Sequence, residues 1–227
     1  MRITLSAAEI YNRLLESDII GSTGFISFNL GETSVTINTT DTVGVTLQAW
    51  LKQWLLENNI YFSEPENTQE FPDFYLNDLN REQNMLEVKA FNYCKTPAFD
   101  IANFESYCAS LEYQSYRLDA DYLIFGYSMG DNGAIRIERI WLKKIWEIAG
   151  TSARYPLKTQ VKRDVIYNIR PSSNFKTGTT PPFRNKEELI RAIYGTLSLY
   201  RGEDVALRWL ENVIRNYRDF TSIELNI

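Results

Sequence analysis

The chain has 227 residues, of which 44% are hydrophobic and 14% aromatic, and this composition is typical of a folded globular protein and excludes a disordered one. The net charge is −5 and the chain contains no histidine, which excludes Ser-His-Asp hydrolases, His-dependent zinc enzymes and nucleases with a histidine base. The two cysteines, Cys94 and Cys108, provide neither a disulfide framework nor a zinc site. Hydrolytic chemistry must therefore come from carboxylates, lysine, tyrosine or a metal held by oxygen.

The sequence also lacks the signatures of membrane proteins and of common nucleotide-binding proteins. The N-terminal residues have no apolar segment of the signal-peptide kind, and no apolar run approaches the roughly eighteen residues of a membrane span. No Gly-rich phosphate loop is present. We expect a cytoplasmic protein with no membrane association and no nucleotide cofactor.

The first elements alternate between helix and strand patterns. The segment Ser6-Ala7-Ala8-Glu9 is a capping box that predicts a helix through about Leu15. Two strand-like runs, 24–29 and 34–38, flank a Gly-Glu turn. Apolar residues at helical spacing then predict an amphipathic helix over about 46–58.

The segment from Pro72 to Lys89 carries the most informative pattern. Asp73 lies in a strand-like run at 71–76, and the following eight residues have turn composition. Residues 85–91 alternate with period two, which places Glu87 and Lys89 on one side of a strand. A hairpin of these two strands brings two carboxylates and one ammonium together.

Carboxylate oxygens suit a hard cation such as Mg²⁺, which keeps several of its waters. A lysine beside such a metal adds a point charge near a phosphate. An alternative is that Glu87 and Lys89 face solvent on an edge strand while Pro72-Asp73 forms only a turn.

The remaining elements predict a mixed α/β protein. Asp100 is expected to cap a helix to about Tyr116, and strands are expected at 122–127 and 134–142. Two periodic helices follow at 185–200 and 203–217. We expect a single domain over 1–227, with a central mixed sheet flanked by helices, a catalytic core at about 45–145, a strand/loop appendage at about 151–186 and helices at the C-terminal end.

The charge is distributed unevenly along the chain. Residues 1–80 carry three basic and eleven acidic side chains, whereas residues 151–186 carry eight basic side chains against the single acid Asp164. Such a basic segment attracts a polyanion despite the overall negative charge. Aromatic and amide side chains are interleaved with the basic residues. We expect this segment to contact double-stranded DNA, a solvated basic hairpin being the alternative.

The Pro-Asp pair followed by Glu-x-Lys resembles the PD-(D/E)xK nuclease superfamily, and within it the type II restriction endonucleases. The resemblance covers about residues 45–145 and implies that Asp73 and Glu87 hold Mg²⁺ and that Lys89 lies beside the attacking water. It also implies a glutamate from the preceding helix as an accessory metal ligand, for which Glu57 is the candidate and Glu64 and Glu66 are rivals.

This resemblance implies a type II site-specific deoxyribonuclease, a homodimer that leaves 5′-phosphate ends on double-stranded DNA. The alternatives are a DNA repair or junction-resolving nuclease of the same superfamily, a non-catalytic DNA-binding protein on the same fold, and a small-molecule binding α/β protein. The expected DNA-binding residues are those of the basic appendage: Lys158, Lys162, Arg163, Arg170, Asn174, Lys176 and Arg184.

Overall fold

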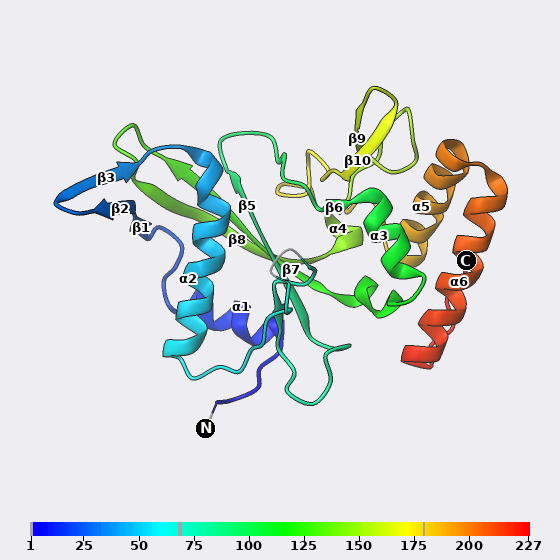
Figure 1. The fold of residues 1–227 in the computed structure, drawn as a ribbon, viewed down its shortest axis with the longest axis horizontal. Helices are drawn as coiled ribbons and strands as arrows, with labels where there is room; N and C mark the ends of the chain where they lie inside the picture. The colour runs from blue at the N-terminus through cyan, green and yellow to red at the C-terminus, as the bar shows by residue number, and fades with distance from the viewer. Residues whose placement is uncertain (1, 68–69, 179) are drawn as a thin grey trace. The chain divides into compact units, whose positions relative to one another are not determined.

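The computed structural model describes residues 2–67, 70–178 and 180–227 (Figure 1). The chain forms two compact units. The first comprises Met1–Pro97 and Asp121–Lys143, and the second comprises Ala98–Ala120 and Lys144–Ile227. The predicted catalytic core at 45–145 therefore contributes to both units, because residues 98–120 belong to the second unit.

A five-stranded mixed sheet forms the centre of the first unit, as the sequence predicts. Its order is β1-β8-β7-β5-β4, with β5 and β7 parallel and with β4 antiparallel to β5. The strands are β1 (Thr23–Gly24), β4 (Phe74–Tyr75), β5 (Met85–Asn92), β7 (Asp121–Met129) and β8 (Ile135–Lys144). The side chains of β5 and β7 are buried for most of their length, so β5 lies inside the sheet and is not an edge strand.

Two helices accompany this sheet. Helix α1 (Ala7–Glu16) begins with the predicted capping box, in which Ser6 and Glu9 exchange hydrogen bonds. Helix α2 (Val43–Glu57) follows the short 3-10 helix η1 (Thr40–Thr42) and buries Val43, Leu47, Leu51 and Leu55 in the core of the unit. The period of this apolar stripe fixes which face of α2 turns towards the sheet.

A two-stranded hairpin extends from the β1 edge of the first unit (Figure 1). It consists of β2 (Ile26–Leu30) and β3 (Thr33–Ile37), which pair in register around the Gly31-Glu32 turn. The predicted strands at 24–29 and 34–38 are therefore confirmed within one or two residues.

The second unit combines a small sheet with helices. The sheet has the order β6-β10-β9, formed by β6 (Ala102–Asn103), β9 (Thr159–Lys162) and β10 (Val165–Ile169). The helices are α3 (Phe104–Leu111), η2 (Ser115–Asp119), α4 (Ile145–Ile148), α5 (Lys186–Arg201) and α6 (Glu203–Thr221). Helices α5 and α6 confirm the two helices expected at the C-terminal end.

The predicted helix start at Asp100 is wrong. Ile101 donates its N–H to the carbonyl of Ile169, and β6 continues this pairing with β10, so the backbone at 101–103 is extended. The helix begins only at Phe104, where Asn103 caps it by accepting from the Ser106 N–H. Asp100 forms an ion pair with Arg170 instead.

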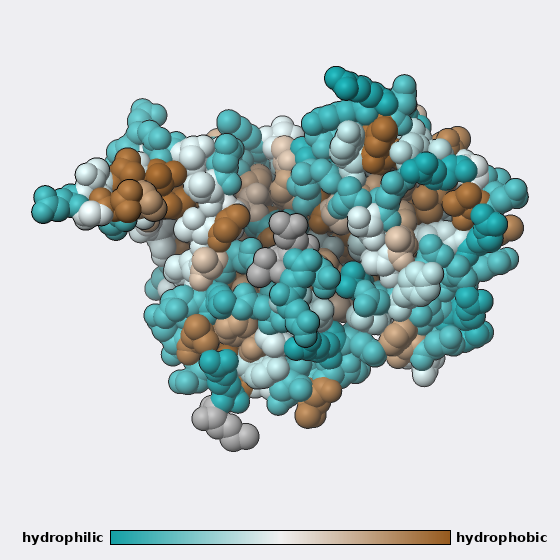
Figure 2. Space-filling view, viewed as in Figure 1, coloured by the Kyte–Doolittle hydropathy of each residue, from teal (hydrophilic) through white to brown (hydrophobic). Residues whose placement is uncertain are grey.

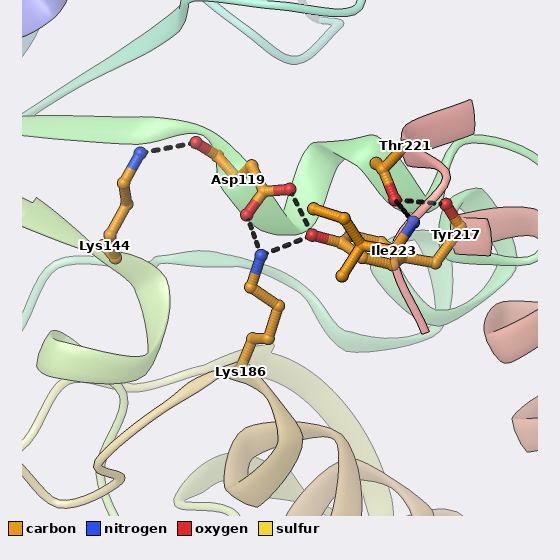
Figure 3. A network of polar contacts seen from close by, with 6 residues as sticks. All are labelled: Asp119, Lys144, Lys186, Tyr217, Thr221 and Ile223. Carbon is orange, nitrogen blue, oxygen red and sulfur yellow. Dashed lines mark hydrogen bonds and ion pairs between the residues drawn. The ribbon is translucent and has the colours of Figure 1, made fainter. Parts of the chain in front are cut away.

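A half-buried polar network joins the helices of the second unit (Figure 3). Lys186 donates to Asp119 and to the Tyr217 hydroxyl, and Tyr217 Oη donates to Asp119 Oδ2 at 2.7 Å. Lys144 Nζ also donates to the Asp119 carbonyl at 2.6 Å. Burial and the Asp119 carboxylate raise the pKa of Tyr217, so this hydroxyl remains protonated and can donate. Lys186 is one of the eight basic side chains of residues 151–186, and its contacts with Asp119 and Tyr217 hold helices of this unit together.

No helix in the described part of the chain is long and apolar enough to cross a membrane.

Candidate active site

Strands β4 and β5 bring Asp73, Glu87 and Lys89 into one cluster. The register pairs Phe74 with Leu86, so Asp73, which immediately precedes β4, lies opposite Glu87. The Asp73 N–H donates to Glu87 Oε2 at 3.2 Å, and the Val88 N–H donates to Asp73 Oδ2 at 2.7 Å. The hairpin geometry thus delivers the convergence that the strand pattern predicts.

Lys89 lies on the same side of β5 as Glu87, as the period-two pattern predicts. The distance from Lys89 Nζ to Glu87 Oε1 is 2.8 Å. The Glu87 side chain is only 11% exposed and that of Lys89 only 20%, so the pair lies in a largely desolvated setting. Coulomb interactions are stronger there than on the surface of the protein.

Gln48, which the sequence interpretation did not single out, is a further member of the cluster. It extends from the middle of α2, and its Nε2 donates to Asp73 Oδ1 at 2.7 Å. Both oxygens of Asp73 therefore accept one hydrogen bond from the protein. The only signal in the sequence was a glutamine next to Leu47, at the border of the apolar stripe of α2, and amides at such borders are common on helices that carry no site.

The environment of Asp73 opposes its negative charge. Burial, and secondly the charge of Glu87, raise the pKa of Asp73 from 3.8 to about 7, although the Val88 N–H and Lys89 act in the opposite direction. Two carboxylates held together out of water repel each other unless a cation or a proton lies between them. The arrangement therefore favours a bound cation at neutral pH.

The predicted accessory ligand Glu57 does not join this cluster. It is the exposed last residue of α2, and Gln53 Nε2 donates to its carboxylate at 2.9 Å. It follows Gln48 by about two and a half helical turns, or roughly 13 Å, which places it on the opposite side of the helix. Within the described residues, no group of three or more His, Cys, Asp or Glu side chains is positioned to hold a metal ion.

The two rivals to Glu57 differ in their surroundings. Glu66 is exposed. Glu64 forms an ion pair with Lys52 at 2.6 Å, and its charge makes a minor contribution to the raised pKa of Asp73. Lys52 is thus the ion-pair partner of Glu64, and the carboxylates that meet in the cluster are those of Asp73 and Glu87.

The predicted DNA-binding residues all lie in the second unit and fall into two groups. Three of them are held by the protein itself. Lys158 Nζ donates to the Pro171 carbonyl at 3.0 Å, Arg170 forms its ion pair with Asp100, and Arg184 forms one with Glu188. The contacts of Lys158 and Arg170 lie beside β9 and β10, whereas that of Arg184 lies at the start of α5.

The other predicted residues lie on exposed turns. Lys162 ends β9 and its Nζ lies 5.7 Å from the centre of the Tyr167 ring, and Arg163 occupies the β9–β10 turn with a φ of 50°. Asn174 is exposed and Lys176 half-buried in a turn further along the chain. Of the seven predicted DNA-binding residues, three therefore form contacts within the protein and four lie on turns or strand ends.

A mixed sheet that carries two buried carboxylates and a lysine on adjacent strands is the arrangement expected of a restriction endonuclease. Comparison with known proteins gives the same class. The sequence model of the NgoBV restriction endonuclease family matches residues 4–227, and the chain belongs to this family. The prediction of a type II restriction endonuclease is thereby confirmed.

Two curated relatives and one solved structure illustrate the similarity. The chain is 40% identical to the type II restriction enzyme NlaIV of Neisseria lactamica over 198 residues, covering 86% of this chain and 82% of the relative. It is 37% identical to the type II restriction enzyme NgoBV of Neisseria gonorrhoeae over 162 residues, covering 71% of this chain and 92% of the relative. The solved structure of the NlaIV restriction endonuclease superposes with a TM-score of 0.92 at 36% identity, covering 100% of this chain and 94% of that one. The fold class predicted from the sequence is confirmed by this match.

Proposed function

We propose that this restriction endonuclease hydrolyses phosphodiester bonds of double-stranded DNA with Mg²⁺ held by Asp73 and Glu87 and with Lys89 beside the attacking water. The observation that carries the proposal is the desolvated cluster itself. Glu87 lies within hydrogen-bonding distance of both the Asp73 backbone and the Lys89 ammonium, and the raised pKa of Asp73 favours a cation at neutral pH.

The donor set fits a hard divalent ion, the class to which Mg²⁺ belongs. It offers carboxylate oxygens and contains neither histidine nor cysteine, so soft or nitrogen-preferring metals have no suitable ligand. Restriction enzymes of this class generally use divalent metal ions. Two protein carboxylates leave room for waters and phosphate oxygens, as Mg²⁺ sites in phosphoryl-transfer enzymes usually do.

Each side chain of the cluster has a distinct task in the proposed mechanism. When bound, Mg²⁺ would acidify a water and neutralise charge on the phosphate. Lys89 donates a hydrogen bond towards the attacking water and stabilises the charge of the pentacovalent transition state. Gln48 and the Val88 N–H hold the Asp73 carboxylate in one orientation, which preserves the geometry needed for attack in line with the leaving oxygen.

The exposed basic turn of the second unit is the strongest candidate for DNA contact. Lys162 and Arg163 stand exposed on the β9–β10 hairpin, where Lys162 Nζ lies over the Tyr167 ring. Lysine and arginine in this position supply phosphate contacts and, for arginine, recognition of guanine. We further propose that two copies of the chain act together, one on each DNA strand, and leave 5′-phosphate ends.

The test is cleavage of unmethylated phage DNA by the purified protein with Mg²⁺ and, separately, with EDTA. Discrete bands that require Mg²⁺ are expected, and end labelling by a kinase should succeed only after phosphatase treatment. Asp73→Ala and Lys89→Ala should abolish cleavage, whereas Glu57→Gln should cleave as the wild type does. Circular dichroism checks that each variant folds. Retained cutting by either of the first two variants contradicts the assigned roles.

A smear in place of bands would contradict site-specific cleavage and favour the repair or nonspecific alternative. Equal cutting in the presence of EDTA would contradict the metal requirement while leaving the nuclease class intact.

A further inference from the structure

The β9–β10 hairpin of the second unit has one buried face and one exposed face. Ile166 and Ile169 of β10 are 2% and 0% exposed, so they belong to the core of the unit. Tyr167, which lies between them in the chain, is 42% exposed, and Val165 is 43% exposed. The register pairs Val165 with Lys162, and residues paired directly across two strands share a face. The exposed face therefore carries Lys162, Val165 and Tyr167.

An irregularity in the strand pairing brings two amide side chains together on this face. The register shifts between residues 166 and 169 of β10, so that Tyr167 and Asn168 stand opposite the single residue Gln160 of β9. A bulge of this kind redirects a side chain. Gln160 lies two residues before Lys162 and therefore shares its exposed face. Asn168 Nδ2 donates to Gln160 Oε1 at 3.3 Å, and both side chains are half-buried.

This amide pair offers hydrogen-bond donors and an acceptor side by side. The bond within the pair uses one N–H of Asn168 and the side-chain oxygen of Gln160. It leaves Asn168 Oδ1 as an acceptor and the two N–H groups of Gln160 as donors. The edge of each base pair in the major groove of DNA presents a distinct combination of acceptors and donors. The pair therefore has the chemistry needed to recognise such an edge.

The shape of the hairpin suits the major groove. Two paired strands lie about 4.8 Å apart, and the major groove, about 12 Å wide, admits a two-stranded ribbon, whereas the minor groove, about 6 Å wide, does not. Strand β9 forms the edge of its three-stranded sheet, so the hairpin is the outer part of that sheet. Hydrophilic residues predominate on the surface over β9 and β10 (Figures 1 and 2).

The two-residue turn at the end of the hairpin keeps two charged side chains in a strained conformation. Arg163 has a φ of 50° and Asp164 a φ of 61°, and glycine or asparagine is favoured at such positions. Strain of this kind is characteristic of functional sites. Asp164 forms an ion pair with Arg154 at 2.8 Å, so its charge is balanced, whereas Arg163 is exposed at the tip.

The charge of this part of the chain favours DNA over a neutral or basic partner. Residues 151–170 carry five basic side chains and one acidic side chain, Asp164, and such an excess attracts a phosphate backbone. Lys162 Nζ lies 5.7 Å from the centre of the Tyr167 ring, which holds the ammonium beside the exposed face. Phosphate contacts supply affinity without sequence information, whereas groups that reach base edges supply specificity. The hairpin has residues of both kinds next to each other.

We propose that the exposed face of the β9–β10 hairpin enters the major groove of double-stranded DNA. The Gln160–Asn168 amide pair contacts the edge of a base pair there, and Lys162 and Arg163 contact the neighbouring phosphates. Gln160 and Asn168 are then residues that determine sequence specificity. This inference rests on the proposed function, in which the hairpin contacts DNA, and it assigns the reading of sequence to these two amides.

The experiment compares the binding of two DNA duplexes by the full-length protein in Ca²⁺. The specific duplex is the sequence that the wild type enriches from a random pool, and the reference duplex has the same composition in scrambled order. The wild type should bind the specific duplex about 1,000-fold more tightly or better. Gln160→Met and Asn168→Leu should each reduce this preference by about 10-fold or more. Neither should change the affinity for the reference duplex or the slope of log K against log salt.

Two control variants separate base reading from phosphate contact and from the loss of an amide as such. Lys162→Ala should weaken binding to both duplexes alike and reduce the slope of log K against log salt by about 1. Gln53→Met is the matched control for Gln160→Met, because Gln53 is a half-buried amide of α2 that donates to Glu57. It should keep the preference of the wild type.

A measurement on the unaltered chain guards against misfolding of the variants. Replacing single purines of the specific duplex by 7-deazapurines removes the N7 acceptor from the major groove and leaves the minor groove unchanged. At one or more positions this replacement should weaken binding by the wild type about 10-fold. The same replacement should have little further effect on Gln160→Met or Asn168→Leu, because the contact is already lost.

Four results would each overturn the proposal: no sequence enriched from the pool, a preference retained in both amide variants, equal weakening of both duplexes by these variants, or binding by the wild type that no 7-deazapurine affects. Cleavage of phage DNA in Mg²⁺ is scored separately. Discrete cutting together with an unaltered preference in the amide variants refutes the base contacts alone. Sequence-selective binding by a protein that does not cut refutes the nuclease proposal alone.

Discussion

The charge of Asp73 is expected to destabilise the metal-free protein. The carboxyl has a pKa of about 7 in the folded state against 3.8 as its ordinary value. Between these values the folded state retains a proton that the unfolded chain has lost, so the free energy of unfolding falls as the pH rises through the interval and stays low above it. We expect Asp73→Asn, which removes the charge, to stabilise the metal-free protein at pH 8.

The magnitude follows from the pKa difference. By linkage, the raised pKa of Asp73 lowers the free energy of unfolding by at most about 4 kcal/mol at pH 8 and about 1.5 kcal/mol at pH 5. The substitution keeps the hydrogen bond from the Val88 N–H, and the Gln48 amide can rotate to accept from the new amide group. We therefore expect a gain of about 1–3 kcal/mol at pH 8 and a smaller gain at pH 5.

The assay is urea unfolding in EDTA, followed by the fluorescence of the five tryptophans. Asp78→Asn is the matched control, because Asp78 is an exposed carboxylate in the loop between the same two strands; its effect should be below about 0.5 kcal/mol. If Asp73→Asn were less stable than the wild type at pH 8, or gained equally at both pH values, the desolvation argument would be refuted.

Five further substitutions test other parts of the molecule. Gln48→Leu should lower the single-turnover cleavage rate by about 10- to 100-fold through loss of a hydrogen bond to a charged group, and Gln48→Glu should alter the Mg²⁺ concentration needed for half-maximal rate, which a purely structural role would leave unchanged. Arg163→Ala should weaken binding of DNA in Ca²⁺ and reduce the slope of log K against log salt by about 1; an unchanged slope would remove Arg163 from the interface. Glu57→Gln should show wild-type rates and metal dependence because its carboxylate is exposed and far along α2 from Gln48. Lys186→Met should lower the free energy of unfolding by about 1–3 kcal/mol by leaving Asp119 without its ammonium partner, and a neutral result in urea unfolding would show that the network contributes no stability.

Local patterns in the sequence were sufficient for the elements that carry the site. The capping box at Ser6 depends on residues three positions apart, and the side of β5 shared by Glu87 and Lys89 depends on the alternation of a strand. Both are properties of a few neighbouring residues, so they are visible without the fold. The turn composition between Asp73 and Glu87 likewise indicates the hairpin that joins them.

Contacts between distant segments decided the rest. The amphipathic stripe of α2 shows which face is buried but not how the helix is placed along the sheet, and this placement selects Gln48 over Glu57 as the neighbour of Asp73. The pairing of 101–103 with β10 moves the start of α3 to Phe104, because backbone hydrogen bonds to a strand more than sixty residues away replace those of a helix.

The sequence by itself therefore determined the nuclease motif, the order of helices and strands and the basic character of residues 151–186. The tertiary structure decided which basic side chains are held by the fold, such as Arg170 by Asp100, and which face of the β9–β10 hairpin is exposed. The physical reason is that periodicity and capping act between near neighbours, whereas ion pairs and surface exposure depend on segments that only the folded chain brings together.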